Sequence, residues 1–259
     1  MGSYSNASPY GEPELPETID LARTYDDWHQ RIFDSSPEHP DESSPWYQLV
    51  LEYLGPVSGK RVIEVSCGRG GFSTCLASKG AIVCAADFAL SALRIARQKA
   101  KKAGTRDRRV LWAQADAHHL PFAEGVFDVV ISCETIEHLA DPQRALRELA
   151  RVCKKQGLLY LTTPNYLNLM GAYHVYDLVL KRNRQSPAVQ PIEHYWLFPR
   201  VRSMVKNAGW EILRSDGTVH QVPFPGTNPI RIFPLERSRV VRRCLGPLAY
   251  HYFLMGRKR

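Results

Sequence analysis

An acidic residue and a glycine-rich turn stand together between Glu64 and Gly71, and these residue types are typical of a nucleotide-binding loop. The run reads Glu64-Val65-Ser66-Cys67-Gly68-Arg69-Gly70-Gly71. Glycines let a backbone turn tightly and approach a ligand without a Cβ in the way. If a helix follows, its first amides face the same ligand. Taken alone, such a loop is a weak indication, because several classes of cofactor use it.

Two cofactor classes fit this loop, and the acid distinguishes them. A dinucleotide fingerprint requires G-x-G-x-x-G, but counting from Gly68 the sixth position is Ser73. Glu64 would also place a carboxylate near a pyrophosphate. S-adenosylmethionine has no phosphate, and its methionine end carries an ammonium group that a nearby acid suits. The sequence therefore favours S-adenosylmethionine, while a dehydrogenase remains formally possible.

Two further acids follow at positions where a nucleoside would be held. Asp87 comes after a second apolar run, 23 residues beyond Glu64, where a carboxylate can accept hydrogen bonds from both ribose hydroxyls. Asp116 follows a third apolar run, near where an adenine edge would lie. His118 and His119 fall in the same loop without a carboxylate at useful spacing, and we interpret them as structural.

Carboxylates and imidazoles gather again after a fourth apolar run. If Glu134, Glu137 and His138 form the first turn of a helix, their spacing of i, i+3 and i+4 places them on one face. His194 is a fourth candidate, from a distant segment. Two carboxylates and two imidazoles suit Mg²⁺ or Mn²⁺, although the histidines would also accept Zn²⁺ or Fe²⁺. Two alternatives stay open: His138 or His194 acts as a general base without metal, or the group is structural.

These residues are positioned by alternating strands and helices. Apolar runs predict strands at residues 61–66, 81–87, 110–116, 127–133 and 157–163, with helices at 71–79, 89–104 and 141–155. This alternation of strands and helices predicts a doubly wound α/β fold with a mostly parallel, seven-stranded sheet. The carboxyl ends of its strands are where a ligand should bind. Residues 210–217 and 250–258 are expected to supply the closing strands.

The rest of the chain is divided around this core. We expect a disordered N-terminus at residues 1–18, a helical cap at 19–58 with helices near 19–33 and 46–54, a cofactor-binding core at 59–165 and an acceptor-side insertion with closing strands at 166–259. Within the last segment, residues 166–182 and 199–209 have helical spacing. Tyr25 and Trp28 could cover the cofactor from the first helix, or face the core.

Composition excludes several classes of protein. With 44% hydrophobic and 23% charged residues among 259, the chain can bury a core, so global disorder is excluded. It has neither an apolar run long enough to span a membrane nor a signal-peptide pattern, and we expect a soluble, cytoplasmic protein. The six cysteines are irregularly spaced, which favours free thiols over a disulfide framework.

Charge is unevenly distributed along the chain. The formal net charge is +8, but residues 1–58 carry 2 basic and 11 acidic side chains. The segment from Arg231 to Arg259 carries 8 basic residues against Glu236 alone. Such a surface could attract RNA, anionic lipid or phosphorylated metabolites, or simply be solvated, and charge alone does not rank these.

Five ordered stretches resemble the class I S-adenosylmethionine-dependent methyltransferases, in particular the branch with the ubiquinone-pathway O-methyltransferases. They are VIEVSCGRGGFS, CAADFA, QADAHHLPF, FDVVISCETIEHL and GLLYLTTPN, and together they span about residues 60–165. The resemblance implies a Rossmann-like fold and implies cofactor contacts from Glu64, Ser66, Gly68, Gly70, Asp87, Phe88, Asp116, Ala117 and Cys133. Ser66 departs from the pattern, which has glycine there. A serine is tolerated if its φ is negative, which we expect, but weakens binding if φ is positive.

The resemblance also extends to metal-dependent relatives, which use an E-x-x-E-H run and a distal histidine. It implies that Glu134, Glu137, His138 and His194 bind Mg²⁺ or Mn²⁺, and that Glu134, His138 and His194 take part in catalysis. The expected reaction is O-methylation of a small or lipid-like hydroxyl acceptor. That acceptor would lie beside the aromatic residues Tyr166, Tyr173, Tyr195, Trp196 and Phe198. The alternatives are 2′-O-methylation of an RNA 3′ end and a non-catalytic cofactor-binding protein. Peripheral membrane contact and the oligomeric state stay open.

Overall fold

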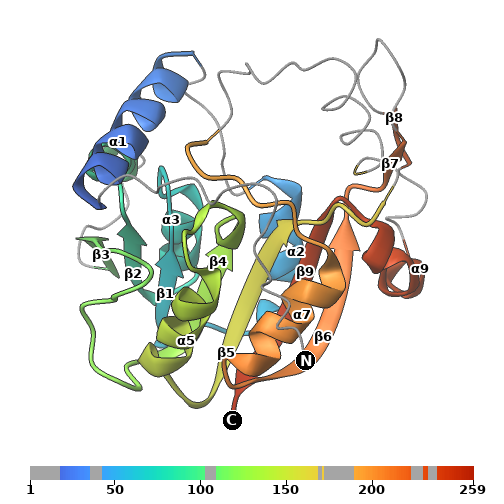
Figure 1. The fold of residues 1–259 in the computed structure, drawn as a ribbon. Coiled ribbons are helices and arrows are strands. Elements are labelled where there is room, and N and C mark those ends of the chain that lie inside the picture. Colours follow the sequence, from blue (N-terminus) through green and yellow to red (C-terminus); the bar gives the residue numbers. More distant parts are fainter. Residues whose placement is uncertain are drawn as a thin grey trace, which may run out of the picture.

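The core of the protein is one sheet of seven strands (Figure 1). The computed structural model describes residues 18–35, 43–102, 109–168, 171, 190–222, 230–232 and 238–259. The strands lie in the order β3-β2-β1-β4-β5-β9-β6. Their bounds are β1 Arg61–Val65, β2 Ile82–Asp87, β3 Val110–Gln114, β4 Phe127–Cys133, β5 Cys153–Pro164, β6 Trp210–Thr218 and β9 His251–Lys258.

The sheet is parallel in its first half and antiparallel at one end. Strands β3, β2, β1, β4 and β5 are all parallel neighbours. Strand β9 runs antiparallel between β5 and β6. The strand order reverses between β1 and β4, so the carboxyl ends of these two strands flank the topological switch point. The predicted doubly wound fold is confirmed.

Helices cover both faces of the sheet (Figure 1). Apolar side chains of α2 (Pro45–Leu54), α3 (Gly71–Ser78) and α4 (Leu90–Lys102) belong to the core on one face. Those of α5 (Pro142–Val152) and α7 (Phe198–Asn207) belong to the core on the other. Large side chains that are at most 1% exposed, such as Tyr160, Trp210 and Phe253, fill these two layers. The remaining elements are α1 (Thr18–Ser35), η2 (Ile136–His138), β7 (Gln221–Val222), β8 (Ile230–Arg231), α9 (Arg239–Leu245) and η3 (Gly246–Leu248).

The prediction of a helix over residues 141–155 is wrong at its end. Helix α5 ends at Val152, and β5 begins at Cys153. Cys153 pairs with Phe127, and the Lys154 ammonium lies 2.6 Å from an Asp128 carboxylate oxygen on β4. These contacts with a neighbouring strand override the helical preference of two lysines, which the local pattern does not reveal.

The structure differs from the sequence-based expectations in three further places. Helix α2 is no cap, because Tyr47, Leu49, Val50 and Leu54 are buried against the sheet. Residues 166–168 are not helical, and most of the helix predicted over 166–182 lies outside the described residues, as do residues 1–17. Residues 115 and 116, predicted as strand, lie beyond the end of β3.

The helices and the cysteines of the described residues bear on the environment of the chain. In the part that the structure describes, no helix is both long enough and apolar enough to cross a membrane. All six cysteines belong to described segments and are free thiols, four of them buried.

Candidate active site

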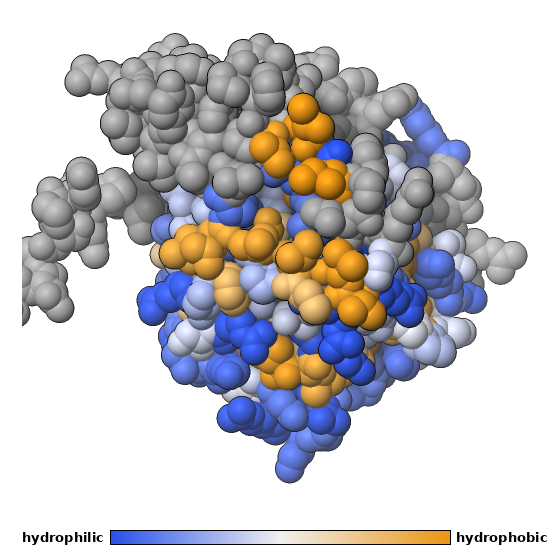
Figure 2. All heavy atoms as spheres, turned by 90° about the vertical axis from the view of Figure 1, so that its right-hand side faces the viewer, coloured by the Kyte–Doolittle hydropathy of each residue, from blue (hydrophilic) through white to orange (hydrophobic). Residues whose placement is uncertain are grey.

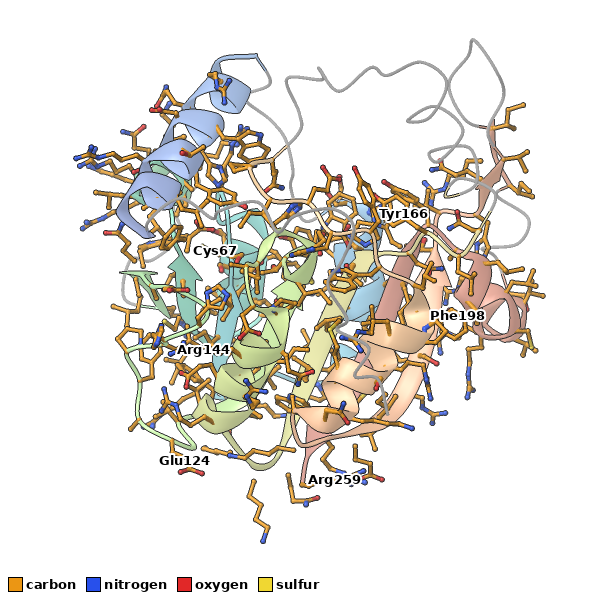
Figure 3. All side chains as sticks on the ribbon, viewed as in Figure 1. Cys67, Glu124, Arg144, Tyr166, Phe198 and Arg259 are labelled. Carbon is orange, nitrogen blue, oxygen red and sulfur yellow. The ribbon has the colours of Figure 1, made fainter. Side chains whose placement is uncertain are left out.

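The glycine-rich loop joins β1 to α3 beneath α1, where Figure 3 labels Cys67. Three of its residues have left-handed backbone conformations: Ser66 with φ of 60°, Gly68 with 51° and Gly70 with 70°. The expectation of a negative φ at Ser66 is therefore wrong, and a serine occupies a position that glycine adopts more easily. Gly70 is required for a second reason, because a Cβ there would lie 2.5 Å from the Trp112 ring.

Glu64 is buried below this loop with one carboxylate oxygen unpaired. It is 1% exposed, and Oε2 accepts a hydrogen bond from the Ser73 hydroxyl. Oε1 is buried and has no hydrogen-bond partner among the described residues. Burial raises the pKa of Glu64 to about 7. A ligand cation beside Oε1 would favour the ionised carboxylate.

Asp87 ends β2 and holds the loop by its backbone. Its Oδ2 accepts from the Gly68 amide at 2.8 Å, and Oδ1 accepts from the Ala89 amide at 2.9 Å. Asp87 is 6% exposed, and the half-buried Phe88 follows it. Each carboxylate oxygen has a second lone pair, so these bonds leave Asp87 able to accept from ligand hydroxyls.

Asp116 lies in the loop after β3 and is held by His118. The His118 amide and ring Nδ1 donate to Asp116 Oδ1 at 2.8 and 2.6 Å. Burial acts to raise the pKa of Asp116, but these hydrogen bonds outweigh it and lower the pKa to about 2. Ala117 and Cys133, which complete the predicted cofactor set, are 6% and 5% exposed. The structural interpretation of His118 is therefore supported by geometry.

Helix α1 docks against the same edge of the sheet. The Tyr25 hydroxyl donates to the His138 carbonyl at 3.0 Å, and the Tyr25 ring lies edge-on to Phe88. Asp26 Oδ1 accepts from the Ser91 amide at the start of α4 at 2.7 Å. The Trp28 indole nitrogen is buried without a hydrogen-bond partner among the described residues. Helix α1 thus contacts the loops after β2 and β4 and the start of α4.

The second group of acids does not form one helical face. Glu134 precedes η2 and has φ of 49°, so the spacing rule that predicted a common face does not apply to it. Glu137 is 2% exposed and accepts from the Thr163 hydroxyl at 2.9 Å. Burial, and then the neighbouring charge of Glu134, hold its pKa well above the usual range. Oε1 of each glutamate is buried and unpaired within the described part of the chain.

The two histidines of this group bind backbone carbonyls. His138 Nδ1 donates to the Ile192 carbonyl at 2.8 Å, which leaves Nε2 as the acceptor atom, 2.8 Å from the Gln190 amide nitrogen and 3.7 Å from Glu137 Oε1. Burial lowers the pKa of His138, which favours the neutral ring. His194 Nε2 donates to the Leu139 carbonyl at 3.0 Å. Among the described residues, no three side chains of metal-ligand type converge on one point.

His251 belongs to this site and escaped the sequence analysis. It starts β9, and its Nδ1 lies 2.9 Å from Glu134 Oε2. The Trp46 ring of α2 packs on its imidazole, with centroids 4.8 Å apart. The only sequence signal was its position at the start of the predicted closing strand. Antiparallel pairing brings that position to the carboxyl end of β5, and only the strand order reveals this.

Only some of the aromatic residues expected beside the acceptor lie together. Tyr166 packs edge-on against Tyr195 with centroids 4.9 Å apart and also lies near Tyr250. Tyr166 follows the carboxyl end of β5, at the end of the sheet opposite to Glu124 (Figure 3). Trp196 is half-buried, and its ring lies 5.0 Å from that of His194. Phe198, at the start of α7, packs on the core residue Tyr252 of β9, and Tyr173 lies outside the described residues.

Comparison with known proteins identifies the family. Residues 63–161 match the model of a methyltransferase domain. A ubiquinone biosynthesis O-methyltransferase of Paracidovorax citrulli is 33% identical over 200 residues, which cover 74% of this chain and 79% of that protein. A demethylmenaquinone methyltransferase of Clavibacter sepedonicus is 35% identical over 140 residues, 52% of this chain and 54% of that protein.

Solved structures agree on the fold. A methyltransferase from Mesorhizobium loti has a TM-score of 0.60 at 16% identity and covers 84% of this chain and 99% of that one. The [4+2]-cyclase SpnF has a TM-score of 0.63 at 20% identity and covers 95% and 97%. The fold alone therefore does not fix the reaction, whereas the sequence relatives are methyltransferases. The chain belongs to the class I S-adenosylmethionine-dependent methyltransferases.

Proposed function

We propose that this methyltransferase methylates a hydroxyl oxygen of a small or lipid-like acceptor. The observation that carries the proposal is the pair of buried, unpaired carboxylate oxygens on Glu134 and Glu137, beside the His138 imidazole, whose lowered pKa favours its neutral form. Such groups accept a hydrogen bond from a hydroxyl and can take up its proton. The names of the ubiquinone-pathway relatives, which are O-methyltransferases, support the same choice.

The cofactor would lie over β1 and β2. The unpaired Glu64 Oε1 suits the ammonium group of the methionine moiety, while the loop from Ser66 to Gly70 presents backbone rather than side chains. Asp87 and Phe88 would hold the ribose, and Asp116 with Ala117 and Cys133 would surround the adenine. When bound, S-adenosylmethionine supplies an activated methyl group on a positively charged sulfur.

The protein's own contribution is to position the acceptor and hold its proton. Glu134 and His138 stand at the end of β4, and His194 approaches from the segment before α7, where its amide donates to the Glu137 carbonyl at 2.7 Å. Tyr166, Tyr195 and Trp196 provide apolar surface for the rest of the acceptor and exclude water. Correct placement of the oxygen is the main source of rate in such a displacement.

We include a divalent cation, Mg²⁺ or Mn²⁺, in the proposal. Glu134, Glu137 and His138 would hold it only after their side chains move together, because among the described residues they do not converge on one point, and His138 Nε2 accepts from the Gln190 amide. The cation would lower the pKa of the acceptor hydroxyl. His194 would join only after its bond to the Leu139 carbonyl breaks.

Calorimetric titration with Mn²⁺, in the presence of S-adenosylhomocysteine, tests the cation. We expect saturable binding that Glu137→Gln removes and that Glu124→Gln, at a side chain that is 75% exposed and lies before the start of β4, preserves. If the wild-type protein takes up no Mn²⁺, the cation is excluded and the imidazoles remain as proton acceptors.

Methyl transfer from labelled S-adenosylmethionine to a panel of hydroxyl and amine acceptors tests the function itself. We expect label in an ether and none in an amine. The Trp196→Ala protein should lose turnover while it keeps affinity for S-adenosylhomocysteine. Unchanged kinetics in this variant would remove the aromatic residues from the acceptor site.

A second candidate is a cofactor-binding protein without methyl transfer, and the positive φ of Ser66 is the observation that favours it. Labelled product from any acceptor excludes it. Methylation of an RNA 3′ end remains an alternative within the enzyme class, and the panel should contain an RNA oligonucleotide with a free 3′ end. Transfer to that oligonucleotide should fall steeply with salt if the basic surface holds the phosphates.

A further inference from the structure

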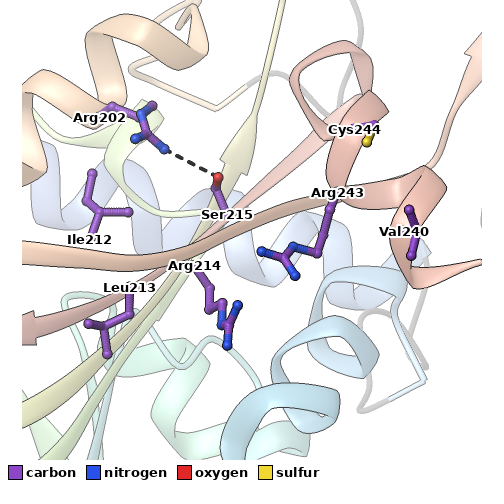
Figure 4. Close-up of a pocket in the computed structure, with 8 residues that line it drawn as sticks. All are labelled: Arg202, Ile212, Leu213, Arg214, Ser215, Val240, Arg243 and Cys244. Atoms are coloured by element: carbon purple, nitrogen blue, oxygen red, sulfur yellow. Dashed lines mark hydrogen bonds between the residues drawn. The ribbon is translucent and has the colours of Figure 1, made fainter.

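One hollow lies along β6 and a second lies on helix α7, both away from the proposed active site. The first has a volume of about 430 Å³ and is lined by Arg202, Ile212, Leu213, Arg214, Ser215, Val240, Arg243 and Cys244 (Figure 4). The second, of about 310 Å³, is lined by Phe198, Pro199, Arg202, Ser203 and Lys206. They share Arg202, so they form one surface, which we name the β6-edge groove.

The first hollow runs along the edge of the strand. Its lining includes four consecutive residues of β6, from Ile212 to Ser215. The register with β9 shifts between Ile212 and Arg214, so strict alternation fails here, but side chains from both sides of the strand border the hollow, which therefore follows the edge. Figure 4 shows Ile212 and Ser215 on one side of the strand and Leu213 and Arg214 on the other. Strand β6 is last in the sheet and pairs with β9 alone among the strands that the structure describes.

The groove carries positive charge without compensation. Arg202, Arg214, Arg243 and Lys206 line it, and its lining contains no acid. No ion pair joins these four cations to an acid of the described segments. On the same helix α9, Arg239 and Arg242 behave differently, because both bind Glu52. The charge of Arg243 is therefore left for a partner.

Apolar side chains accompany these cations. Val240 on α9 is 71% exposed, and Leu248 on η3 is 54% exposed. The face of the molecule that contains this edge has apolar side chains set among hydrophilic ones (Figure 2). A partner with alternating acidic and apolar residues would match both features.

We propose that the β6-edge groove binds an extended, acidic segment of a partner protein, which adds to the sheet as a strand beside β6. A strand edge presents backbone N–H donors and carbonyl acceptors in alternation. Another extended polypeptide can form hydrogen bonds with both. A phosphate or a lipid phosphate offers acceptors only. A second copy of this edge would place arginines opposite arginines, which is destabilising. The cations that prevent such self-association attract an acidic strand.

The test uses a fluorescent seven-residue peptide that alternates glutamate and valine, with binding followed by anisotropy. We expect saturable binding by the full chain that weakens as salt rises. A peptide of the same sequence with alternate backbone nitrogens methylated should bind at least tenfold more weakly, because it cannot complete the strand pairing. Amide hydrogen exchange at residues 212–215 should slow on binding of the first peptide.

Charge reversal locates the binding surface. The Arg214→Glu, Arg243→Glu double variant should lose at least tenfold in affinity. The matched control, Arg94→Glu with Arg97→Glu, makes the same charge change at exposed positions of α4 and should bind as the wild type does.

Three outcomes would overturn the proposal. One is no binding of the acidic peptide at millimolar concentration, and another is equal loss in both double variants. The third is equal binding of the methylated peptide, which would make the groove a general anion site. Tighter binding to vesicles that contain phosphatidylglycerol, or to an RNA oligonucleotide, with no slowing of exchange at 212–215, would assign the groove to that ligand instead.

Discussion

At the scale of single residues, burial decides what the carboxylates can do. Glu64 and Glu137 are nearly inaccessible, and burial raises the pKa of each. Asp116, half-enclosed but bound by His118, has its pKa lowered to about 2. Residues of one chemical type therefore differ in protonation at the same pH, which suits them to different ligands.

The raised pKa of Glu64 predicts a pH-dependent stability. A carboxyl whose pKa rises from 4.5 unfolded to about 7 folded holds its proton more tightly in the native state. The free energy of unfolding should fall as pH rises from 4.5 to 7, by up to an amount on the order of 3 kcal/mol. Urea titrations of wild type and Glu64→Gln across pH 5 to 7.5 test this. The free energy of unfolding of the variant should fall less over this pH range than that of the wild type. An equal fall in both proteins would contradict the raised pKa.

The left-handed backbone of Ser66 predicts that glycine is better there. Ser66→Gly should raise the free energy of unfolding by about 1 kcal/mol, because a Cβ at positive φ is strained. Ser78→Gly, at the right-handed end of α3, should not raise it and serves as control. Thermal unfolding of both variants measures the difference. Stabilisation by both, or by neither, would argue against strain at Ser66.

At the scale of elements, α1 matters because it connects the loops around the cofactor site. The Tyr25 hydroxyl bonds the His138 carbonyl, the Tyr25 ring lies against Phe88, and Asp26 bonds the start of α4. Because α1 contributes no strand to the sheet, it can move without unfolding the core.

Tyr25→Phe removes one of these bonds. We expect faster amide exchange in α1 and several-fold weaker binding of S-adenosylhomocysteine, while the free energy of global unfolding changes by about 1 kcal/mol at most. Asp27→Asn, an exposed change on the same helix, should alter neither quantity. Exchange in α1 that matches the wild type would show that this bond does not hold the helix.

Elements were predictable where their own pattern determines them. Apolar runs predict the strands β1, β2 and β4. The glycine-rich turn predicts the cofactor loop and the helix α3 that follows it. The end of α5 and the start of β5 were not predictable, because Lys154 is fixed by Asp128 on another strand. His251 and the φ of Glu134 depend on strand order and backbone geometry, which the one-dimensional pattern does not contain.

At the scale of the whole molecule, β9 joins the parallel and antiparallel halves of the sheet. It lies between β5 and β6, and its Phe253 stacks on Tyr53 and is fully buried. The last strand in the sequence thus completes both the core and the acceptor side of the site through His251.

Loss of this packing should therefore destabilise the whole fold. Phe253→Ala should lower the free energy of unfolding by about 3–5 kcal/mol, because it leaves a cavity in the core. Val240→Ala, at a side chain that is 71% exposed, should change it by about 0.5 kcal/mol or less. Urea denaturation gives both values. A loss below about 1 kcal/mol for Phe253→Ala would mean that β9 is not integral to the core.

Calorimetric titration of the purified protein with S-adenosylhomocysteine, with NAD as the comparison ligand, tests the cofactor assignment most directly. The account predicts one saturable site for S-adenosylhomocysteine, weakened by Asp87→Ala, and no uptake of NAD. Binding of NAD, or no heat with S-adenosylhomocysteine at any concentration reached, would contradict it.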